Sequence, residues 1–136
     1  MGDQVNSVNM PDLAVSTDST MLFMFSAITW NRHRIHYDAE AARQEGHADV
    51  VAQRALIGNF FARHLKSWRS GQGNLERLSW KVVNSALPGQ ELIVKGTGRE
   101  LRTDPRGDTW WCEQELIVAS TQQVIATAQA EVGFPS

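Results

Sequence analysis

Residues 49–68 constrain the fold more than any other stretch of the chain, because they have the character of one long helix with apolar side chains on more than one face. Asp49 stands where an N-cap residue is expected. Arg63, His64 and Lys66 fall in the last turns, where positive charge suits the helix dipole. A helix that is apolar nearly all round in its first turns is a buried helix. Its apolar residues are Val50, Val51, Ala55, Leu56, Ile57, Phe60, Phe61, Leu65 and Trp68.

The chain after this helix alternates with the period of β-strands. The small side chains of the last alternating segment, mostly alanine, indicate that something bulky packs against it, and the long helix is the obvious candidate. We therefore expect an antiparallel meander of about four strands curled around the helix, an α+β arrangement known as the hot-dog fold. The alternating segments are 78–83, 92–95, 110–118 and 124–132, and turn residues at 88–89, 104–108 and 119–121 separate them.

The residues ahead of the long helix are expected to form two shorter helices. One covers residues 19–29 and is capped by Thr17 or Asp18, and the other covers residues 39–45 and is capped by Asp38. The segment between them breaks the helical period and is expected to be a surface loop. The apolar face of the first helix is expected to consist of Met21, Leu22, Phe25 and Ile28.

Residues 1–10 are polar and have no period, so we expect a flexible, dispensable arm ahead of a single domain that spans residues 11–136. Residues 13–15 are expected to add a short edge strand. A chain of 136 residues with 42% hydrophobic content is long enough for one core and too short for two domains.

Composition excludes several classes of partner. A net charge of −2, with the 13 lysines and arginines scattered, gives no attraction for nucleic acid. No apolar run approaches the roughly 20 residues of a membrane span, and the N-terminus has no signal-peptide pattern. The single cysteine, Cys112, cannot form an internal disulfide and has no partner at metal-binding spacing. We therefore expect a cytoplasmic protein with no bound metal and no cofactor.

The segment just before the long helix is dense in reactive side chains. Residues 25–38 read Phe-Ser-Ala-Ile-Thr-Trp-Asn-Arg-His-Arg-Ile-His-Tyr-Asp. This segment resembles the active-site stretch of the MaoC-like hydratases and dehydratases, and it is closest to the branch called hydroxyacyl-thioester dehydratase type 2. The resemblance continues through the long helix and the strands and covers roughly residues 19–133.

This resemblance implies an enzyme that adds or removes water across the 2,3 double bond of an acyl thioester of coenzyme A or acyl carrier protein. In the family motif Asp-x-Asn-Pro-aliphatic-His, His36 matches the histidine, Asn31 the aspartate and His33 the asparagine. His36 and Asn31 are therefore the candidate catalytic residues, and His33 is a candidate substrate contact. Asn31 is a departure from the motif, because an amide holds a water but cannot shuttle a proton.

A second departure lies at the start of the long helix, where the family often has a His-Gly pair whose glycine N–H polarises the thioester carbonyl. The matching residues here are Gln53 and Arg54, which are candidate substrate-binding residues. A backbone N–H at a helix N-terminus binds an oxygen whatever side chain it carries. The alternative is that both residues form only the polar side of the first turn.

Two other functions stay open. Asn31 in place of an acid favours a partner or acyl-thioester-binding subunit of a heteromeric dehydratase, whereas the retained His36 favours an enzyme. A hot-dog thioesterase generally needs a carboxylate in or just ahead of the long helix, and Asp49 is the one candidate there. For each function, exposed sheet edges predict a homodimer, a higher oligomer or pairing with a second MaoC-like chain.

Overall fold

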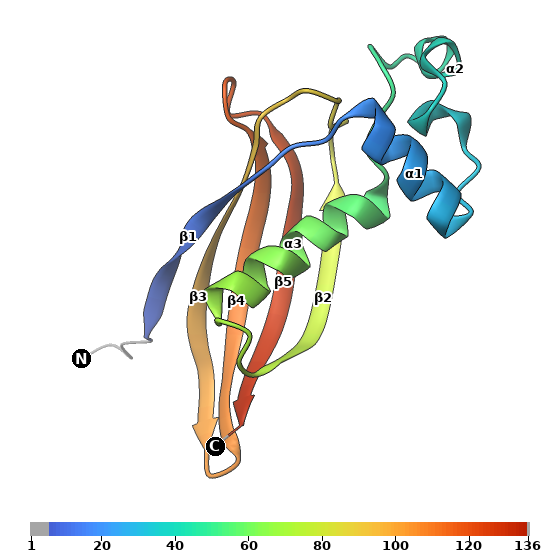
Figure 1. Ribbon diagram of the computed structural model, residues 1–136. Coiled ribbons are helices and arrows are strands. Elements are labelled where there is room, and N and C mark those ends of the chain that lie inside the picture. The colour runs from blue at the N-terminus through green and yellow to red at the C-terminus, as the bar shows by residue number, and fades with distance from the viewer. Residues whose placement is uncertain (1–5, 136) are drawn as a thin grey trace.

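The computed structural model describes residues 6–135 as a five-stranded antiparallel sheet with one long helix packed against it (Figure 1). The strand order is β1-β3-β4-β5-β2. The strands are β1 Ser7–Val15, β2 Asn74–Val82, β3 Leu92–Asp104, β4 Gly107–Val118 and β5 Val124–Pro135. The helices are α1 Ser19–Thr29, α2 Ala39–Gln44 and α3 Arg54–Trp68, with a single 3-10 turn, η1 Arg34–His36, between α1 and α2.

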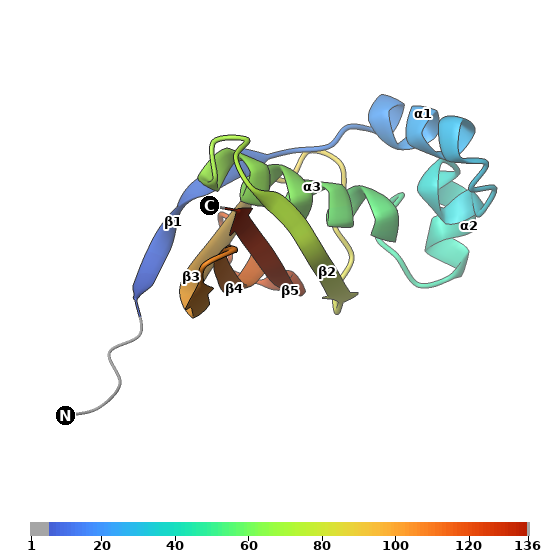
Figure 2. The same cartoon turned by 90° about the horizontal axis from the view of Figure 1, so that it is seen from below.

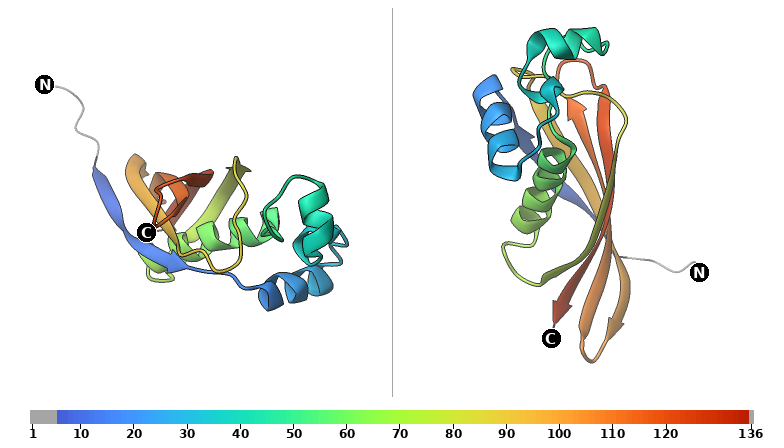
Figure 3. Two further views of the ribbon diagram at one scale, coloured as in Figure 1. Left: turned by 90° about the horizontal axis from the view of Figure 1, so that it is seen from above. Right: turned by 90° about the vertical axis from the view of Figure 1, so that its right-hand side faces the viewer.

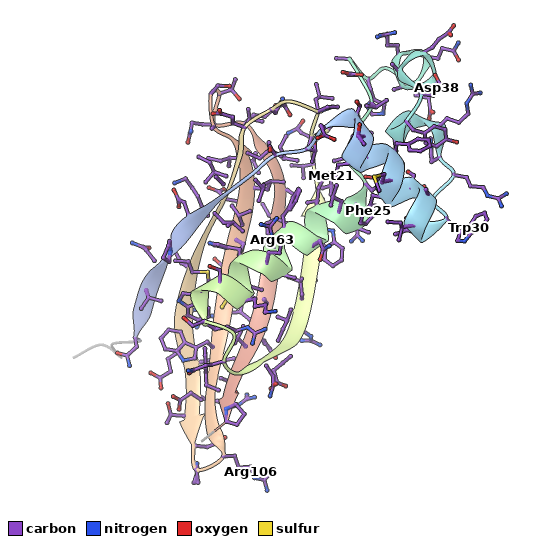
Figure 4. All side chains as sticks on the ribbon, in the orientation of Figure 1. Met21, Phe25, Trp30, Asp38, Arg63 and Arg106 are labelled. Atoms are coloured by element: carbon purple, nitrogen blue, oxygen red, sulfur yellow. The ribbon has the colours of Figure 1, made fainter. Side chains whose placement is uncertain are left out.

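The sheet and α3 form two layers, and the remaining helices lie outside them. Seen from below and from the side, α3 covers one face of the curled sheet (Figures 2 and 3). Helices α1 and α2 lie together beside the sheet, past its β2 edge and near the start of α3 (Figures 1 and 2). Asp38, at the start of α2, and Arg106, at the tip of the β3–β4 hairpin, mark opposite ends of the molecule (Figure 4).

The core forms where α3 meets the small residues of β5. Phe61 and Leu65 of α3 are fully buried, and so are Ala126 and Ala130 of β5, as the alternation of small residues predicted. Small residues on the strand leave room for the bulky helix to approach. Cys112 of β4 is a free, buried thiol in this core, and burial raises its pKa to about 12. No helix within residues 6–135 is long and apolar enough to cross a membrane.

The long helix begins at Arg54, later than the sequence pattern predicted. Residues 50–53 belong to no helix or strand, and the N–H of Val51 donates to the carbonyl oxygen of Ile35 at 3.0 Å. Asp49 therefore lies well before the helix and does not cap it. The pattern was misleading because these residues are buried, as in a buried helix, but they are buried between other segments of the chain.

Helix α1 has the predicted bounds but not the predicted buried face. Asp18 is its N-cap and accepts the N–H of Met21 at 2.7 Å. Leu22 and Ser26 are the buried positions, whereas Ile28 is 76% exposed. The predicted face is therefore only partly right: Leu22 is in the core and Phe25 packs against it, but a short helix at the edge of a domain buries only a narrow stripe.

The N-terminal strand is longer than predicted. Residues 13–15 do lie in an edge strand, but β1 begins at Ser7 and Met10 is only 4% exposed. The prediction of a flexible arm over residues 1–10 is therefore wrong for Ser7–Met10, and residues 1–5 lie outside the described part of the chain. Pairing with β3, which pairs Met10 with Gly96, orders this polar segment.

The predicted four-strand meander is only partly right. Strands β3, β4 and β5 are consecutive neighbours, with turns at the predicted places. Strand β2 pairs with β5 instead of β3, and Trp80 lies opposite Ala128. The chain therefore crosses from one edge of the sheet toward the other between β2 and β3, which local alternation does not reveal.

Candidate active site

His36 lies at the end of η1, beside the irregular segment that leads into α3. Its side chain is buried, and Nδ1 lies 2.7 Å from the carbonyl oxygen of Val51. A carbonyl oxygen only accepts, so Nδ1 carries the proton and donates it to Val51. Nε2 makes no hydrogen bond to the rest of residues 6–135 and is therefore the nitrogen with a free lone pair.

The surroundings of His36 favour its neutral form. Burial lowers the pKa of the imidazole, because a charged ring loses solvation there, while the hydrogen bond to Val51 acts in the opposite direction. The nearby imidazoles of His33 and His47 lower the pKa further. A neutral imidazole with one fixed nitrogen and one free nitrogen is ready to accept a proton near neutral pH.

Asn31 and His33 lie in the turn that precedes η1, and the structure brings them together. The side-chain oxygen of Asn31 accepts the backbone N–H of His33 at 3.2 Å. The ring of His33 is 5.9 Å from that of His36, measured between centroids, with the planes inclined by 64°. Asn31 therefore fixes the backbone that carries His33, and the ring of His33 lies next to that of His36.

Gln53 is the residue before α3, and its side chain holds α1 in place. Its amide nitrogen donates to the carbonyl oxygen of Leu22 at 2.7 Å and to the hydroxyl of Ser26 at 2.9 Å. Its side-chain oxygen is buried and makes no hydrogen bond to any residue that the structure describes. The side chain of Gln53 therefore joins the start of α3 to α1, through Leu22 and the buried Ser26.

Arg54 begins α3 and turns its side chain onto β2. Its guanidinium lies over the ring of Trp80, 4.6 Å from the centroid, and donates to the Trp80 carbonyl oxygen at 2.9 Å. The indole N–H of Trp80 donates back to the carbonyl oxygen of Arg54 at 3.0 Å. This reciprocal contact fixes the first turn of α3 against the sheet.

The N-terminus of α3 is left without a side-chain cap. Gln53 occupies the cap position in an extended conformation, and its side chain makes no capping hydrogen bond. The first backbone N–H groups of a helix have no acceptor within the helix, so they are available to an oxygen of a bound molecule. This end of α3 lies three residues after Val51, which holds His36.

Some neighbours of the site could not be recognised from the sequence. The hydroxyl of Ser85, after β2, lies 3.2 Å from Nδ1 of His47. His47 follows α2, and no local spacing links it to Ser85; the loops after α2 and β2 bring the pair together. Asp38, by contrast, caps α2 as predicted, and the N–H of Ala41 lowers its pKa.

The charged side chains around the loop offer no metal centre. Among residues 6–135, no group of three or more His, Cys, Asp or Glu side chains is arranged to hold a metal ion. Asp49, the carboxylate expected for a thioesterase just ahead of the long helix, accepts the N–H of Val50 at 2.8 Å. The site combines the imidazole of His36 with the uncapped N–H groups of α3.

Comparison with solved structures identifies proteins of the same architecture. The chain is similar to the (R)-hydratase from A. caviae involved in PHA biosynthesis, with a TM-score of 0.76, 14% identity and coverage of 96% of both chains. It is also similar to a chain of the ChsH1-ChsH2 complex from Mycobacterium tuberculosis, with a TM-score of 0.73, 15% identity and coverage of 98% of this chain and 99% of that one. At these identities the likeness concerns the fold, and it confirms the predicted hot-dog architecture.

Sequence comparison carries the relationship further. The chain is 46% identical over 44 residues to the mesaconyl-C(4)-CoA hydratase of Chloroflexus aurantiacus, a match that covers 32% of this chain and only 16% of that protein. The family model for hydroxyacyl-thioester dehydratase type 2 matches residues 4–88, more than half of the chain, including the whole candidate site from Asn31 to Arg54. The predicted family is confirmed: the chain belongs to the hydroxyacyl-thioester dehydratase type 2 family, a MaoC-like hot-dog family.

Proposed function

We propose that this chain is a hydro-lyase that adds or removes water across the 2,3 double bond of an enoyl or 3-hydroxyacyl thioester. The observation that carries the proposal is the setting of His36, which is buried, with Nδ1 bound to Val51 and Nε2 free, and whose pKa burial lowers. Membership of a hydroxyacyl-thioester dehydratase family supports the reaction class. The local similarity to a coenzyme A thioester hydratase supports the substrate class.

His36 is the proton acceptor of this reaction. In the hydration direction, Nε2 takes a proton from water as the water oxygen attacks C3 of the enoyl chain. Negative charge then develops on the thioester oxygen. The uncapped N–H groups at the start of α3 stabilise that charge, because they are fixed and need no reorganisation.

The remaining candidate residues position the reacting parts. Asn31 holds the turn that carries His33, and its amide is also able to hold a water. Gln53 contributes its backbone at the helix cap, since its side-chain nitrogen is bound to α1. Arg54 leaves the front of the helix open, because its guanidinium is folded onto Trp80.

The proposal is tested by incubating the purified chain with a panel of trans-2-enoyl thioesters of coenzyme A and of acyl carrier protein. We expect the absorbance of the conjugated enoyl group to fall as water adds, and the product to be a 3-hydroxyacyl thioester by mass spectrometry. Release of free thiol without hydration would indicate a thioesterase instead. The absence of either product over the whole panel would contradict the proposal.

Asn31 supports a second candidate, a subunit that works only with a catalytic partner. An amide at this position cannot replace a proton-transferring acid. One structure of the same fold is a two-chain complex, the ChsH1-ChsH2 complex. Activity that appears only after a second MaoC-like chain with Asp at the matching position is added would favour this candidate over a self-sufficient enzyme.

Two surfaces support self-association or pairing with such a chain. Within the described chain, β1 pairs only with β3 and β2 only with β5, so each has one free edge. The outer side of α1 also exposes large apolar side chains, namely Phe23, Met24, Ile28 and Trp30. We expect sedimentation to give a dimer or larger species at micromolar concentration, and a monomer alone would contradict this expectation.

A further inference from the structure

Trp30 ends α1 and turns its indole ring toward solvent. It is 75% exposed, whereas the other four tryptophans of the chain are half-buried. Its backbone is left-handed, with φ of 57° and ψ of 28°, a conformation that glycine and asparagine adopt at the end of a helix with much less strain. Neither core packing nor the preference of a helix end therefore accounts for a tryptophan here, and a strained position of this kind points to a function.

The guanidinium of Arg32 lies over the ring of Trp30, with 5.0 Å between Cζ and the ring centroid. Within residues 6–135 Arg32 takes part in no ion pair, whereas Arg34 is paired with Asp38. A stacked guanidinium keeps its edge N–H groups free, in the planar fork that matches a phosphate. Trp30 and Arg32, here called the platform, therefore offer a positive charge without an anion beside an exposed aromatic face.

The backbone of the platform is held on both sides by the candidate active site. The carbonyl oxygen of Ser26 accepts the N–H of Trp30, and the Ser26 hydroxyl is bonded to the side chain of Gln53 just ahead of α3. On the other side, the hydroxyl of Tyr37 donates to the carbonyl oxygen of Arg32 at 3.0 Å. A platform whose backbone is fixed in advance loses little conformational freedom when a ligand binds.

We propose that Trp30 and Arg32 bind the nucleotide end of a coenzyme A thioester, with the adenine ring stacked on the open face of the indole and a phosphate bound by the guanidinium. Aromatic side chains bind bases by stacking, and arginine binds phosphate through two parallel N–H groups. The nucleotide site rests on the proposed function, and it selects coenzyme A over acyl carrier protein as the carrier of the acyl group. The local similarity to a coenzyme A thioester hydratase supports this choice.

The place of the platform suits a ligand that also reaches the candidate active site. Trp30 and His36 are six positions apart (36 − 30 = 6), so their Cα atoms are at most roughly 22 Å apart. In coenzyme A, a long and flexible chain of pantetheine and diphosphate joins the adenosine to the thioester. The nucleotide is therefore able to rest on the platform while the thioester oxygen lies at the start of α3. Acyl carrier protein has the same pantetheine arm without an adenosine, and so has no base for Trp30.

A second copy of the chain is the competing occupant of this surface. Phe23, Met24 and Ile28 on the outer side of α1 are exposed and apolar, and they suit such a contact. Arg32 suits it less, because an interface that buries a guanidinium without an anion bears the cost of removing that charge from water. The charge over the indole therefore favours a ligand that carries a phosphate.

The first test measures the binding of adenosine 3′,5′-bisphosphate, the nucleotide end of coenzyme A, to the full chain by titration calorimetry. We expect saturable binding to the parent. Trp30→Ala should weaken it by about 5–150-fold, the effect of one lost base–aromatic stack, and Trp30→Phe by less. Arg32→Gln should also weaken it and should reduce its dependence on salt, because a charge on the phosphate is lost.

Two substitutions elsewhere in the chain remove the same types of side chain. Trp111→Ala lies on β4, and Arg106→Gln lies at the tip of the β3–β4 hairpin, far from Trp30 (Figure 4). Both variants should bind the bisphosphate as the parent does.

The second test compares the hydration of one enoyl group carried by coenzyme A and by pantetheine, which lacks the nucleotide. The parent should have a KM at least about fivefold lower for the coenzyme A thioester. Trp30→Ala should bring the ratio of the two KM values toward one, and kcat should change less than KM because the platform lies away from the reacting atoms. Trp111→Ala should keep the ratio of the parent.

Several outcomes would overturn the nucleotide site while hydration by the parent still supported the proposed function. They are no binding of the bisphosphate by the parent, equal KM values of the parent for the two carriers, and parent-like binding by Trp30→Ala. A Trp30→Ala protein that changes from dimer to monomer in sedimentation but keeps the affinity of the parent would assign the surface to a second copy instead. A parent that binds the bisphosphate through Trp30 but hydrates neither thioester would contradict the proposed function and keep the nucleotide site.

Discussion

Two buried histidines, one in the core and one at the site, are used in opposite ways. His64 of α3 is 1% exposed, and both of its nitrogens are occupied: Nε2 donates to the carbonyl oxygen of Pro11 at 2.8 Å, and Nδ1 accepts from the side-chain amide of Gln114 at 2.9 Å. His36 is 8% exposed and has only Nδ1 occupied, by Val51. Burial lowers the pKa of both.

The difference shows that burial alone does not identify a reactive histidine. His64 joins three elements, because β1 and β4 supply its partners, and a proton on Nδ1 would break its contact with Gln114. His36 joins only η1 to the segment before α3, and its second nitrogen stays free for chemistry. We therefore expect substitutions of His64 to change stability and substitutions of His36 to change rate.

The largest effect is expected for His36→Ala. The hydration rate should fall by about 10²–10⁴-fold, because the proton acceptor is removed. The free energy of unfolding should fall by only about 1–2 kcal/mol, the scale of one lost hydrogen bond and a partly emptied pocket. His36→Gln is the matched control for structure, since its amide is able to donate to Val51 without acting as a base. Full activity in either variant would show that His36 is not the base.

The next effect is expected for His64→Ala, measured by urea denaturation. The substitution empties a buried site, leaves the carbonyl of Pro11 without its donor and leaves the amide of Gln114 with only its hydrogen bond to the carbonyl of Phe61, so the free energy of unfolding should fall by about 2–4 kcal/mol. The rate per folded molecule should stay close to that of the parent. A folded His64→Ala protein with the rate loss of His36→Ala would remove the distinction between the two histidines.

The sequence predicted those features that depend on neighbours along the chain. The bounds of α1 and the caps Asp18 and Asp38 follow from local hydrogen bonds between a side chain and a nearby N–H, and all are confirmed. The end of α3 at Trp68 and the alternation in β5 were also predictable, because each reflects a local period. The break in the helical period after residue 29 likewise predicted the loop that carries His36.

Features that depend on distant segments were not predictable. His64 was expected to act as a positive charge in the last turns of the helix, but it is buried and bonded to Pro11 of β1 and Gln114 of β4. The start of α3 was misplaced because Val51 is held by Ile35, a contact that no period encodes. Each error arises where one segment is buried by another that is far away in the sequence.

A smaller effect is expected for Gly58→Ala, which tests how tightly the buried face of α3 packs close to the site. A Cβ at Gly58 would collide with the six-membered ring of Trp80. The ring must shift and weaken its contacts with Arg54, at an expected cost of about 1–3 kcal/mol in unfolding free energy despite the better helix propensity of alanine. Asn59→Ala, at the exposed neighbouring position, should stay within about 0.5 kcal/mol of the parent.

If Trp80 is the cause, shortening it should relieve the collision. The double variant Gly58→Ala with Trp80→Leu should be destabilised by less than the sum of the two single variants. Equal stability of Gly58→Ala and the parent would instead mean that β2 yields easily, and that the first turn of α3 is less firmly held than the Arg54–Trp80 contact indicates.

The smallest effect is a dependence of stability on pH, to which both histidines contribute. Their folded pKa values lie below the ordinary value of 6.5. As the pH falls below about 6.5, the unfolded chain therefore binds more protons than the folded protein. The stability that the neutral rings provide is full above that pH and is lost progressively as the pH falls toward the folded pKa values. Each histidine should contribute a slope of up to about 1.4 kcal/mol per pH unit in this window.

Urea denaturation at several pH values, with the parent, His36→Gln and His64→Gln, separates the two contributions. Each substitution should reduce the slope, because glutamine does not titrate. The rate profile should behave differently: His64→Gln should keep the loss of hydration rate at low pH, since that limb belongs to His36, whose neutral Nε2 is the proton acceptor. If His64→Gln lost the acidic limb of the rate profile, that limb would not belong to His36. If both variants kept the stability slope of the parent, neither histidine would be the source of the pH dependence of stability.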